Sequence, residues 1–170
     1  IPETTEKYDP FTVTAEEFIP AFSRQPMSAQ KALYTILTGF SPVMSEEVLY
    51  ESGLDSSLSA NETDPDHILH LYGRIRDLMQ KVSDRDFDPN IIWMEDEPVE
   101  FAPMALSLYE DCRLTRDPSI SHILQEYYEK KSIHTRIRQK SADLRKIVQT
   151  LLERSSRKYD LQLKQLKDTE

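Results

Sequence analysis

Two histidines one helical turn apart are the first candidates for chemistry in this sequence. His67 and His70 are three residues apart, and Asp64 and Asp66 come just before them. Imidazole and carboxylate groups on one face of a helix are ligands that a divalent metal accepts. A metal site also needs a third ligand and supporting hydrogen bonds, for which the sequence offers no pattern. We therefore interpret the histidines as surface residues and predict no metal site.

A second candidate is the acidic run Glu95-Asp96-Glu97, because paired carboxylates serve as general acid and base. The run is expected at the tip of a β-hairpin, where water surrounds the carboxylates. Nothing there would give two of them the different pKa values that an acid and a base need. Cys112, the only cysteine, has no neighbouring histidine to activate it and cannot form an intrachain disulfide. Phosphate-binding glycine loops, nucleophile elbows and zinc-finger spacings do not occur. We predict no catalytic residue and no cofactor.

Basic residues are concentrated in the last third of the chain. Residues 119–170 hold 12 bases and 7 acids, whereas residues 1–118 hold 9 bases and 23 acids. A segment of formal charge +5 therefore follows a segment of −14, within a chain whose net charge is −9. An acidic body with a basic helical arm indicates docking on a polyanion, above all nucleic acid, although a solvated face of a coiled coil gives the same pattern. The candidate RNA-binding residues are Arg136, Arg138, Lys140, Arg145, Lys146, Arg154, Arg157 and Lys158.

Prolines divide the chain into three parts. All ten prolines precede residue 119, and the last 52 residues contain neither proline nor glycine. We expect a linker over 1–13, a globular subdomain over 14–118 and a long helix over 119–170. A single cysteine favours a reducing compartment, and neither a signal peptide nor a membrane-spanning apolar run is present. The chain begins with isoleucine, so we expect a fragment or a processed form.

A helical hairpin is predicted near the start of the subdomain. After a first helix that begins at Thr14, Ser28 is expected to cap a second helix, and the turn Gly39-Phe40-Ser41-Pro42 ends it. Gly39 suits the left-handed position after a helix, and Pro42 suits the first turn of the next one. Helix, glycine turn and helix form a helix-hairpin-helix-like unit. Such units meet phosphate backbones through turn amides in some proteins and are plain folding units in others.

The rest of the subdomain changes from helix to strand. A further helix is expected to begin at Asp64, and a β-hairpin is expected over residues 91–101, with 105–109 as a candidate third strand. Ser119 is expected to open the long helix. The predicted fold class is thus mainly α with a small β-hairpin (α+β), followed by a long coiled-coil helix.

Beyond residue 133 the apolar residues of the long helix form a narrow seam. Ile137, Leu144, Val148 and Leu151 are in heptad phase, although Ser141 and Ser155 interrupt it. A helix of 52 residues would be about 78 Å long, and a bare stripe of this kind needs a partner helix. The partner helix is expected outside this chain or in a second copy.

Three segments together resemble the NFACT family. Residues 32–48 (ALYTILTGFSPVMSEEV) are similar to the family's Gly-x-Ser-Pro hairpin, and residues 98–106 (PVEFAPMAL) to the hairpin segment that follows. Residues 119–131 (SISHILQEYYEKK) and 138–144 (RQKSADL) resemble the helix that leads into its coiled coil. The opening KYDPF at 7–11 is similar to the linker after the family's first subdomain.

The sequence departs from this family at two positions of the hairpin. The family often has alanine where Ser45 stands and arginine near the position of Glu51. Loss of that base weakens the case for nucleic-acid contact by the second helix of the hairpin. The family's Asp-Arg pair of the first subdomain and its C-terminal RNA-binding domain have no counterpart in these residues.

The resemblance implies a non-enzymatic role. RqcH-like members bind large ribosomal subunits blocked by peptidyl-tRNA, recruit alanyl-tRNA and support alanine tailing of the stalled chain. Other members are known as fibronectin-binding adhesins on the surface of Gram-positive bacteria. The expected partners are therefore the large ribosomal subunit and tRNA in the cytoplasm, with fibronectin at the cell surface as the alternative.

Overall fold

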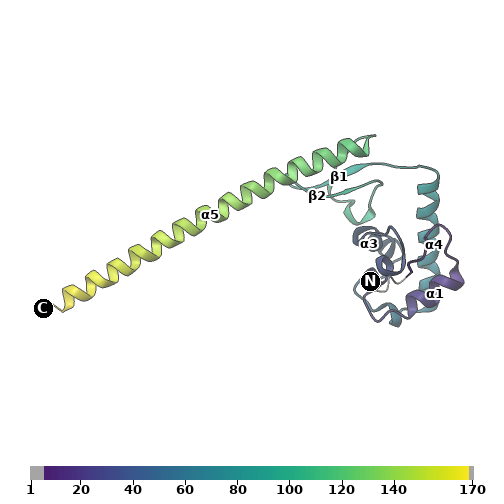
Figure 1. Ribbon diagram of the computed structural model, residues 1–170, viewed down its shortest axis with the longest axis horizontal. Helices are drawn as coiled ribbons and strands as arrows, with labels where there is room; N and C mark the ends of the chain where they lie inside the picture. Colours follow the sequence, from purple (N-terminus) through teal and green to yellow (C-terminus); the bar gives the residue numbers. More distant parts are fainter. Residues whose placement is uncertain (1–5, 169–170) are drawn as a thin grey trace.

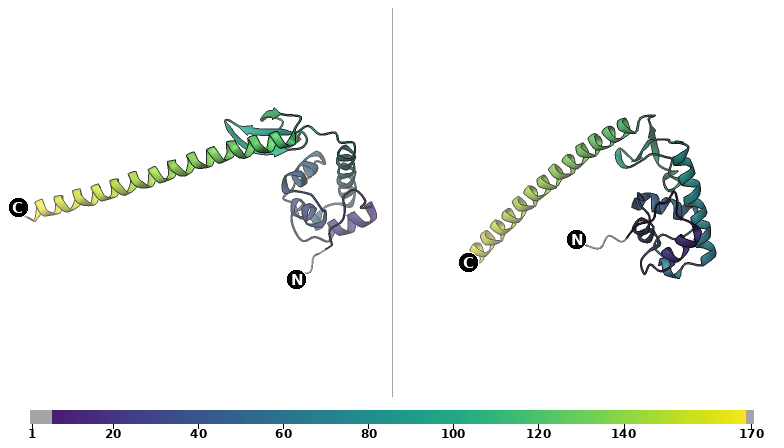
Figure 2. Two further views of the ribbon diagram at one scale, coloured as in Figure 1. Left: turned by 45° about the horizontal axis from the view of Figure 1, so that its top comes forward. Right: turned by 45° about the vertical axis from the view of Figure 1, so that its right-hand side comes forward.

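A long helix projects from a small β-sheet, which in turn rests on a group of short helices (Figure 1). The computed structural model describes residues 6–168. We call α1 to α4 with the segment before them the helical body, and the sheet with the long helix α5 the sheet–arm unit. Two further views show the same arrangement, with the far end of α5 remote from the helical body (Figure 2). The chain is α+β, as the sequence predicts.

The helical body contains four α-helices whose starts follow the predicted capping residues. Thr14 caps α1 (Ala15–Ser23) in a reciprocal arrangement with Glu17, and Ser28 caps α2 (Ala29–Ile36) by accepting the Lys31 amide. Capping of this kind satisfies amides that have no partner within their helix. The remaining elements are α3 (Pro42–Glu51), the short 3₁₀ helix η1 (Ala60–Glu62) and α4 (Pro65–Ser83).

One apolar core holds the helical body together. Phe18 and Phe22 of α1 are stacked with ring centroids 5.7 Å apart, and Tyr72 of α4 packs against Phe18. The apolar faces of α1, α2 and α4 point into this core. Its fully buried large side chains are Phe18, Phe22, Leu33, Leu37, Val48, Leu49, Ile68, Leu71 and Ile75.

The segment before α1 is tied to the helical body by its backbone. The amide of Tyr8 donates to the carbonyl of Ile36, and the amide of Thr38 donates to the carbonyl of Tyr8. The Tyr72 hydroxyl donates to the carbonyl of Val13, which is itself buried. Of the predicted linker 1–13, residues 1–5 lie outside the described residues. Residues 6–13 run along the body.

The sheet has three antiparallel strands in the order β2-β1-β3. The predicted hairpin is confirmed as β1 (Asn90–Met94) and β2 (Glu97–Ala102), joined through Glu95 and Asp96. The sheet is apolar on both faces because alternate residues of β1 are buried on opposite sides. Ile91 and Trp93 pack under α5, whereas Ile92 packs with residues of α3.

The prediction of a third strand at 105–109 is wrong. This segment forms a 3₁₀ turn, η2 (Ser107–Tyr109), because the Glu47 carboxylate of α3 accepts the amides of Ser107 and Leu108. The free edge of β1 is occupied by β3 (Arg113–Arg116) instead. Two of the four residues of β3 are arginines, so hydrophobic alternation does not reveal it.

The predicted long helix is confirmed as α5 (Ile120–Lys167), 48 residues without a break. Ile123 and Tyr127 are buried against the sheet, and beyond residue 134 every described residue of α5 is exposed. The predicted seam residue Ile137 is 57% exposed, so the seam has no partner within the described residues. Within residues 6–168, no helix combines the length and apolar character needed to span a bilayer.

Candidate nucleic-acid interface

The predicted hairpin turn has the geometry that its residues require. Gly39 has a φ of +80°, the left-handed conformation that non-glycine residues avoid. Ser41 caps α3 by accepting the amide of Met44 at 3.2 Å, and Pro42 occupies the first turn. The turn borders an apolar hollow of about 280 Å³ that Phe11 and other residues line. None of the eight arm bases lines that hollow.

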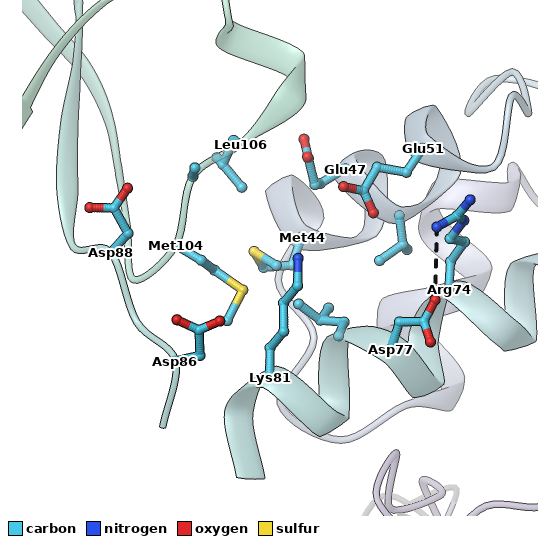
Figure 3. Close-up of a pocket in the computed structure, with 13 residues that line it drawn as sticks. Met44, Glu47, Glu51, Arg74, Asp77, Lys81, Asp86, Asp88, Met104 and Leu106 are labelled. Carbon is cyan, nitrogen blue, oxygen red and sulfur yellow. Dashed lines mark ion pairs between the residues drawn. The ribbon is translucent and has the colours of Figure 1, made fainter. Parts of the chain in front are cut away.

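The second helix of the hairpin is acidic. Within Pro42–Glu51, three residues are glutamates and none is basic, so its surface disfavours a phosphate backbone. Ser45, where the NFACT family often has alanine, is fully buried, and its hydroxyl donates to the Ser41 carbonyl at 2.9 Å. Glu51, where the family often has arginine, lies beside Glu47 at a hollow (Figure 3). These two positions therefore supply no phosphate-binding group.

The hollow beside α3 has a volume of about 410 Å³ and lies between α3, α4 and the chain that leads to and from the sheet (Figure 3). Glu47 is only 4% exposed, and its carboxylate oxygens accept the amides of Ser107 at 2.6 Å and Leu108 at 3.0 Å. Arg74 lies 3.8 Å from Asp77 across the rim, and its Nε is buried without a hydrogen-bond partner. The charged residues of the lining are Glu47, Glu51, Arg74, Asp77, Lys81, Asp86 and Asp88.

The root of the arm is fixed to the sheet by an aromatic cluster. Tyr127 packs edge-on to Phe101 with ring centroids 4.9 Å apart, and its hydroxyl donates to the Val99 carbonyl at 3.3 Å. The Lys131 ammonium lies over the Tyr127 ring and donates to the same hydroxyl. That hydrogen bond raises the pKa of Lys131, so the ammonium stays charged to higher pH. The first three turns of α5 thus form a rigid base for the arm.

Seven of the eight predicted RNA-binding bases are exposed and form no ion pair with other described residues. The exception is Arg138, whose Nη2 donates to both oxygens of Glu97, at 2.7 and 2.9 Å. Glu97 begins β2, so this pair joins the arm to the edge of the sheet. Unpaired exposed bases are available to a polyanion without first breaking an internal contact.

Most of the bases of the arm lie beside its apolar seam, in a neighbouring sector of the helix. With about 100° of rotation per residue, Ile137, Leu144, Val148 and Leu151 fall within one sector of roughly 60°. Six of the eight bases fall in a neighbouring sector of roughly 120°, whose nearest members, Lys140 and Lys158, lie about 20° from Leu151. A partner helix on the seam would therefore be flanked by Lys140 and Lys158 and would leave the other four of these bases in solvent. The six bases are Arg136, Lys140, Lys146, Arg154, Arg157 and Lys158.

The other candidate residues of the sequence are dispersed. His67 and His70 are both exposed on α4, and Glu95 and Asp96 are exposed at the tip of the β-hairpin. Cys112 is half-buried and unpaired next to the sheet. Across residues 6–168, no three or more histidine, cysteine, aspartate or glutamate side chains are grouped as a metal would require.

Two glutamates with structural roles are not indicated by the sequence. Glu47 is buried within a run of polar residues, and Glu97 pairs with an arginine 41 residues later in the chain. The spacing of Val43, Glu47 and Glu51 on one face of α3 is the only local signal for Glu47. Nothing near Glu97 in the sequence points to Arg138, because the contact depends on the direction in which α5 leaves the sheet.

The protein has the architecture of a helical-hairpin body joined through a small sheet to a projecting basic helix. A family model described as "NFACT N-terminal and middle domains" matches residues 1–170, the whole of the sequence. The chain therefore belongs to the NFACT family, as the three sequence segments indicate. A search of curated proteins with this sequence gave no match.

A solved structure shares the fold. It is described as "the crystal structure of the fibrinogen binding protein from Staphylococcus aureus". The two chains superpose with a TM-score of 0.56 and are 18% identical, over 75% of this chain and 43% of the other. The present chain thus spans less than half the length of that protein. At this identity the similarity concerns the fold.

Proposed function

We propose that this chain is a non-catalytic segment of an RqcH-like ribosome-associated quality-control factor. In this role it binds large ribosomal subunits that carry peptidyl-tRNA, acts together with tRNA and supports alanine tailing of the nascent chain. The arm α5 contacts ribosomal RNA or tRNA, and the helical body positions the arm. Such a factor works in the cytoplasm, where ribosomes are.

The observation that carries this proposal is the placement of unpaired bases on a projecting helix. Between Ile133 and Lys158 the arm has eight bases and two acids, and seven of the bases have no ion pair within the described residues. Lysine and arginine side chains bind nucleic acid chiefly by neutralising phosphates. Membership of the NFACT family supports a ribosomal polyanion as the target.

A pair of variants with equal charge tests the proposal. The arm variant carries Lys140→Glu, Arg145→Glu and Lys146→Glu, and the body variant carries Arg24→Glu, Lys31→Glu and Lys81→Glu. All six positions are exposed, and five of them lie in helices, where glutamate is a good helix former. Arg24 directly follows α1, and circular dichroism of both variants checks that they fold. Binding to large subunits carrying peptidyl-tRNA is measured over a series of salt concentrations.

We expect the arm variant to bind more weakly and to show a shallower salt dependence, by about 0.7 to 0.9 units of slope for each phosphate that the arm no longer neutralises. The body variant should bind nearly as the unmodified protein does. Equally weakened binding by both variants would mean that only net charge matters, and binding without salt dependence would exclude the arm as an RNA-binding surface.

The second candidate function is that of a surface adhesin that binds fibronectin. The structural neighbour is described as a fibrinogen binding protein from Staphylococcus aureus, which supports binding to a host protein in general and not to fibronectin in particular. The adhesin alternative predicts saturable binding to immobilised fibronectin that survives the arm substitutions. The same two variants therefore separate the adhesin from the RNA-binding role.

A further inference from the structure

At the peptide bond between Phe87 and Asp88, the backbone hydrogen bonds pass from partners in the helical body to partners in the sheet–arm unit. The amides of Asp84, Arg85 and Asp86 donate to carbonyls at the end of α4. The amide of Asp88 instead donates to Pro103 beside the sheet, at 2.9 Å. Residues up to 87 are therefore bonded to the helical body, and residues from 88 onward to the sheet–arm unit.

Arg85, just before this point, holds a left-handed φ of +56°. Non-glycine residues seldom adopt this conformation, and Arg85 adopts it in the short connection that follows α4. In hinged proteins, a few residues of such a connection absorb the backbone rotation.

Two hollows flank the junction. The charged hollow of about 410 Å³ and the apolar hollow of about 280 Å³ share Met44, Leu78 and Met104 as lining residues. These three side chains therefore separate the two spaces, and Figure 3 shows Met44 and Met104 facing each other across the junction. Methionine is flexible and adapts to altered packing. The junction thus has empty space on both sides and deformable side chains in the middle.

A single buried side chain makes the close hydrogen bonds across the junction. Among the described residues, the crossing hydrogen bonds are donated by the Ser107 and Leu108 amides to the Glu47 carboxylate and by the Ser107 hydroxyl to Glu51. The Glu51 contact is long, at 3.5 Å, and exposed. Glu47 is 4% exposed, and its contact with Ser107 measures 2.6 Å. Charge-assisted bonds to a buried carboxylate are strong and directional.

We infer that the helical body and the sheet–arm unit are two rigid parts joined by a hinge at Phe87–Asp88, and that the Glu47 carboxylate locks this hinge in the orientation seen. The chain connection and the Glu47 contact are the two polar attachments, and Val43 and Met44 of α3 also pack on the sheet. The hollows beside this packing leave room for rotation about the line between the two polar attachments. α5 is about 72 Å long at 1.5 Å per residue. A rotation of about 10° would therefore move the far end of the arm by roughly 12 Å. The hinge does not depend on what the arm binds.

Distance measurements between the two parts test the hinge. Spin labels are placed at Lys31→Cys on α2 and Gln139→Cys on α5, in a background with Cys112→Ser. Both labelled positions are exposed, and neither is among the candidate RNA-binding residues. The distance distribution from double electron–electron resonance is recorded for the parent and for Glu47→Gln, in which an amide replaces the carboxylate. Glu46→Gln is the matched control, because Glu46 contacts Gln30 within the helical body.

We expect a narrow distribution for the parent and for Glu46→Gln, and a distribution for Glu47→Gln that is broadened or displaced by several ångströms. A label pair within the sheet–arm unit, Asp96→Cys with Gln162→Cys farther along α5, should be unaffected by Glu47→Gln, and both positions are exposed. If Glu47→Gln does not fold, Glu47→Asp replaces it, since the shorter carboxylate retains the charge and reaches at most one amide. Distributions with the same width and the same mean distance as that of the parent, in the folded Glu47 variants, would overturn the hinge.

Discussion

Arg138 of α5 and Glu97 of β2 are joined by two hydrogen bonds from one guanidinium nitrogen, at 2.7 and 2.9 Å. This contact lies one residue beyond Ile137, where the arm has already left the packed part of the sheet. Glu97 is thus an intramolecular anion that pairs with one of the eight bases of the arm. The pair is largely exposed, with 73% of the Arg138 side chain accessible. A pair of this kind contributes about 0 to 1 kcal/mol.

Replacing Glu97 by glutamine should strengthen RNA binding. The substitution releases Arg138 for a phosphate, so the affinity at low salt should rise about two- to fivefold, the equivalent of the energy of an exposed ion pair. Glu95→Gln removes the same charge from the neighbouring exposed turn and serves as the control. Titration of a fluorescent RNA with the three proteins measures the effect. Equal increases from both substitutions would show that Arg138 is not held back by Glu97.

Truncation of Ile123 should detach the arm from the sheet. Ile123 is fully buried with Ile91 and Trp93, and Ile123→Ala should lower the free energy of unfolding of this region by about 2 to 4 kcal/mol. Trp93, the only tryptophan, belongs to the same cluster and reports the change by its fluorescence in a urea titration. Ile137→Ala, at an exposed position of the same helix, should change the result by less than about 0.5 kcal/mol.

Two glycine-to-alanine substitutions should have opposite effects on stability. Gly39 has a φ of +80°, and an added Cβ at Gly39 or at Gly73 would meet no atom within 4 Å. Gly39→Ala should therefore destabilise by about 1 to 2 kcal/mol through backbone strain alone. Gly73 lies inside α4, where alanine is the better helix former, and Gly73→Ala should stabilise by about 0.5 to 1 kcal/mol. Urea midpoints that shift in the same direction would contradict this explanation.

Tyr109 should make stability fall at high pH. Burial, and then the negative charges of Glu100 and Glu46, raise the pKa of Tyr109 above its ordinary value of 10.0. The unfolded chain therefore loses this proton first. The contribution to stability is fully present below pH 10.0 and is lost as pH rises through the higher pKa of the folded state.

Tyr109→Phe tests this sign. The difference in unfolding free energy between about pH 8 and about pH 11 should be smaller in this variant than in the parent. Tyr50→Phe, at a 52% exposed position, is the control. An unchanged pH dependence in Tyr109→Phe would exclude the partly buried Tyr109 hydroxyl as its source.

Local signals predict the helices well because their determinants are close in sequence. Thr14, Ser28 and Asp64 each cap the helix that the sequence places after them, and Gly39 ends the hairpin's first helix. β3 escapes prediction because its pairing with β1 depends on residues about 20 positions apart. The burial of Glu47 cannot be predicted from its neighbours in the sequence either. Its partners, the Ser107 and Leu108 amides, are 60 and 61 residues away.

The candidate bases of the arm are predictable as a group, and their individual surroundings are not. Exposure of Lys140 or Arg154 follows from a helix that is polar on most of its surface. The pairing of Arg138 and the hydrogen bond of Lys131 to Tyr127 require knowledge of how α5 crosses the sheet. Long-range geometry, rather than residue type, decides which bases are free.

The length of α5 changes which charge an approaching polyanion experiences. Electrostatic interactions in physiological salt decay over a Debye length of about 8 Å. Lys158 lies 20 residues beyond Arg138, or about 30 Å along the helix, which is several Debye lengths from the acids of the sheet and body. Repulsion from those acids is therefore screened before it reaches the end of the arm. A protein with a net charge of −9 can in this way present a locally positive end to a polyanion, and the rate of such an association would fall as ionic strength rises.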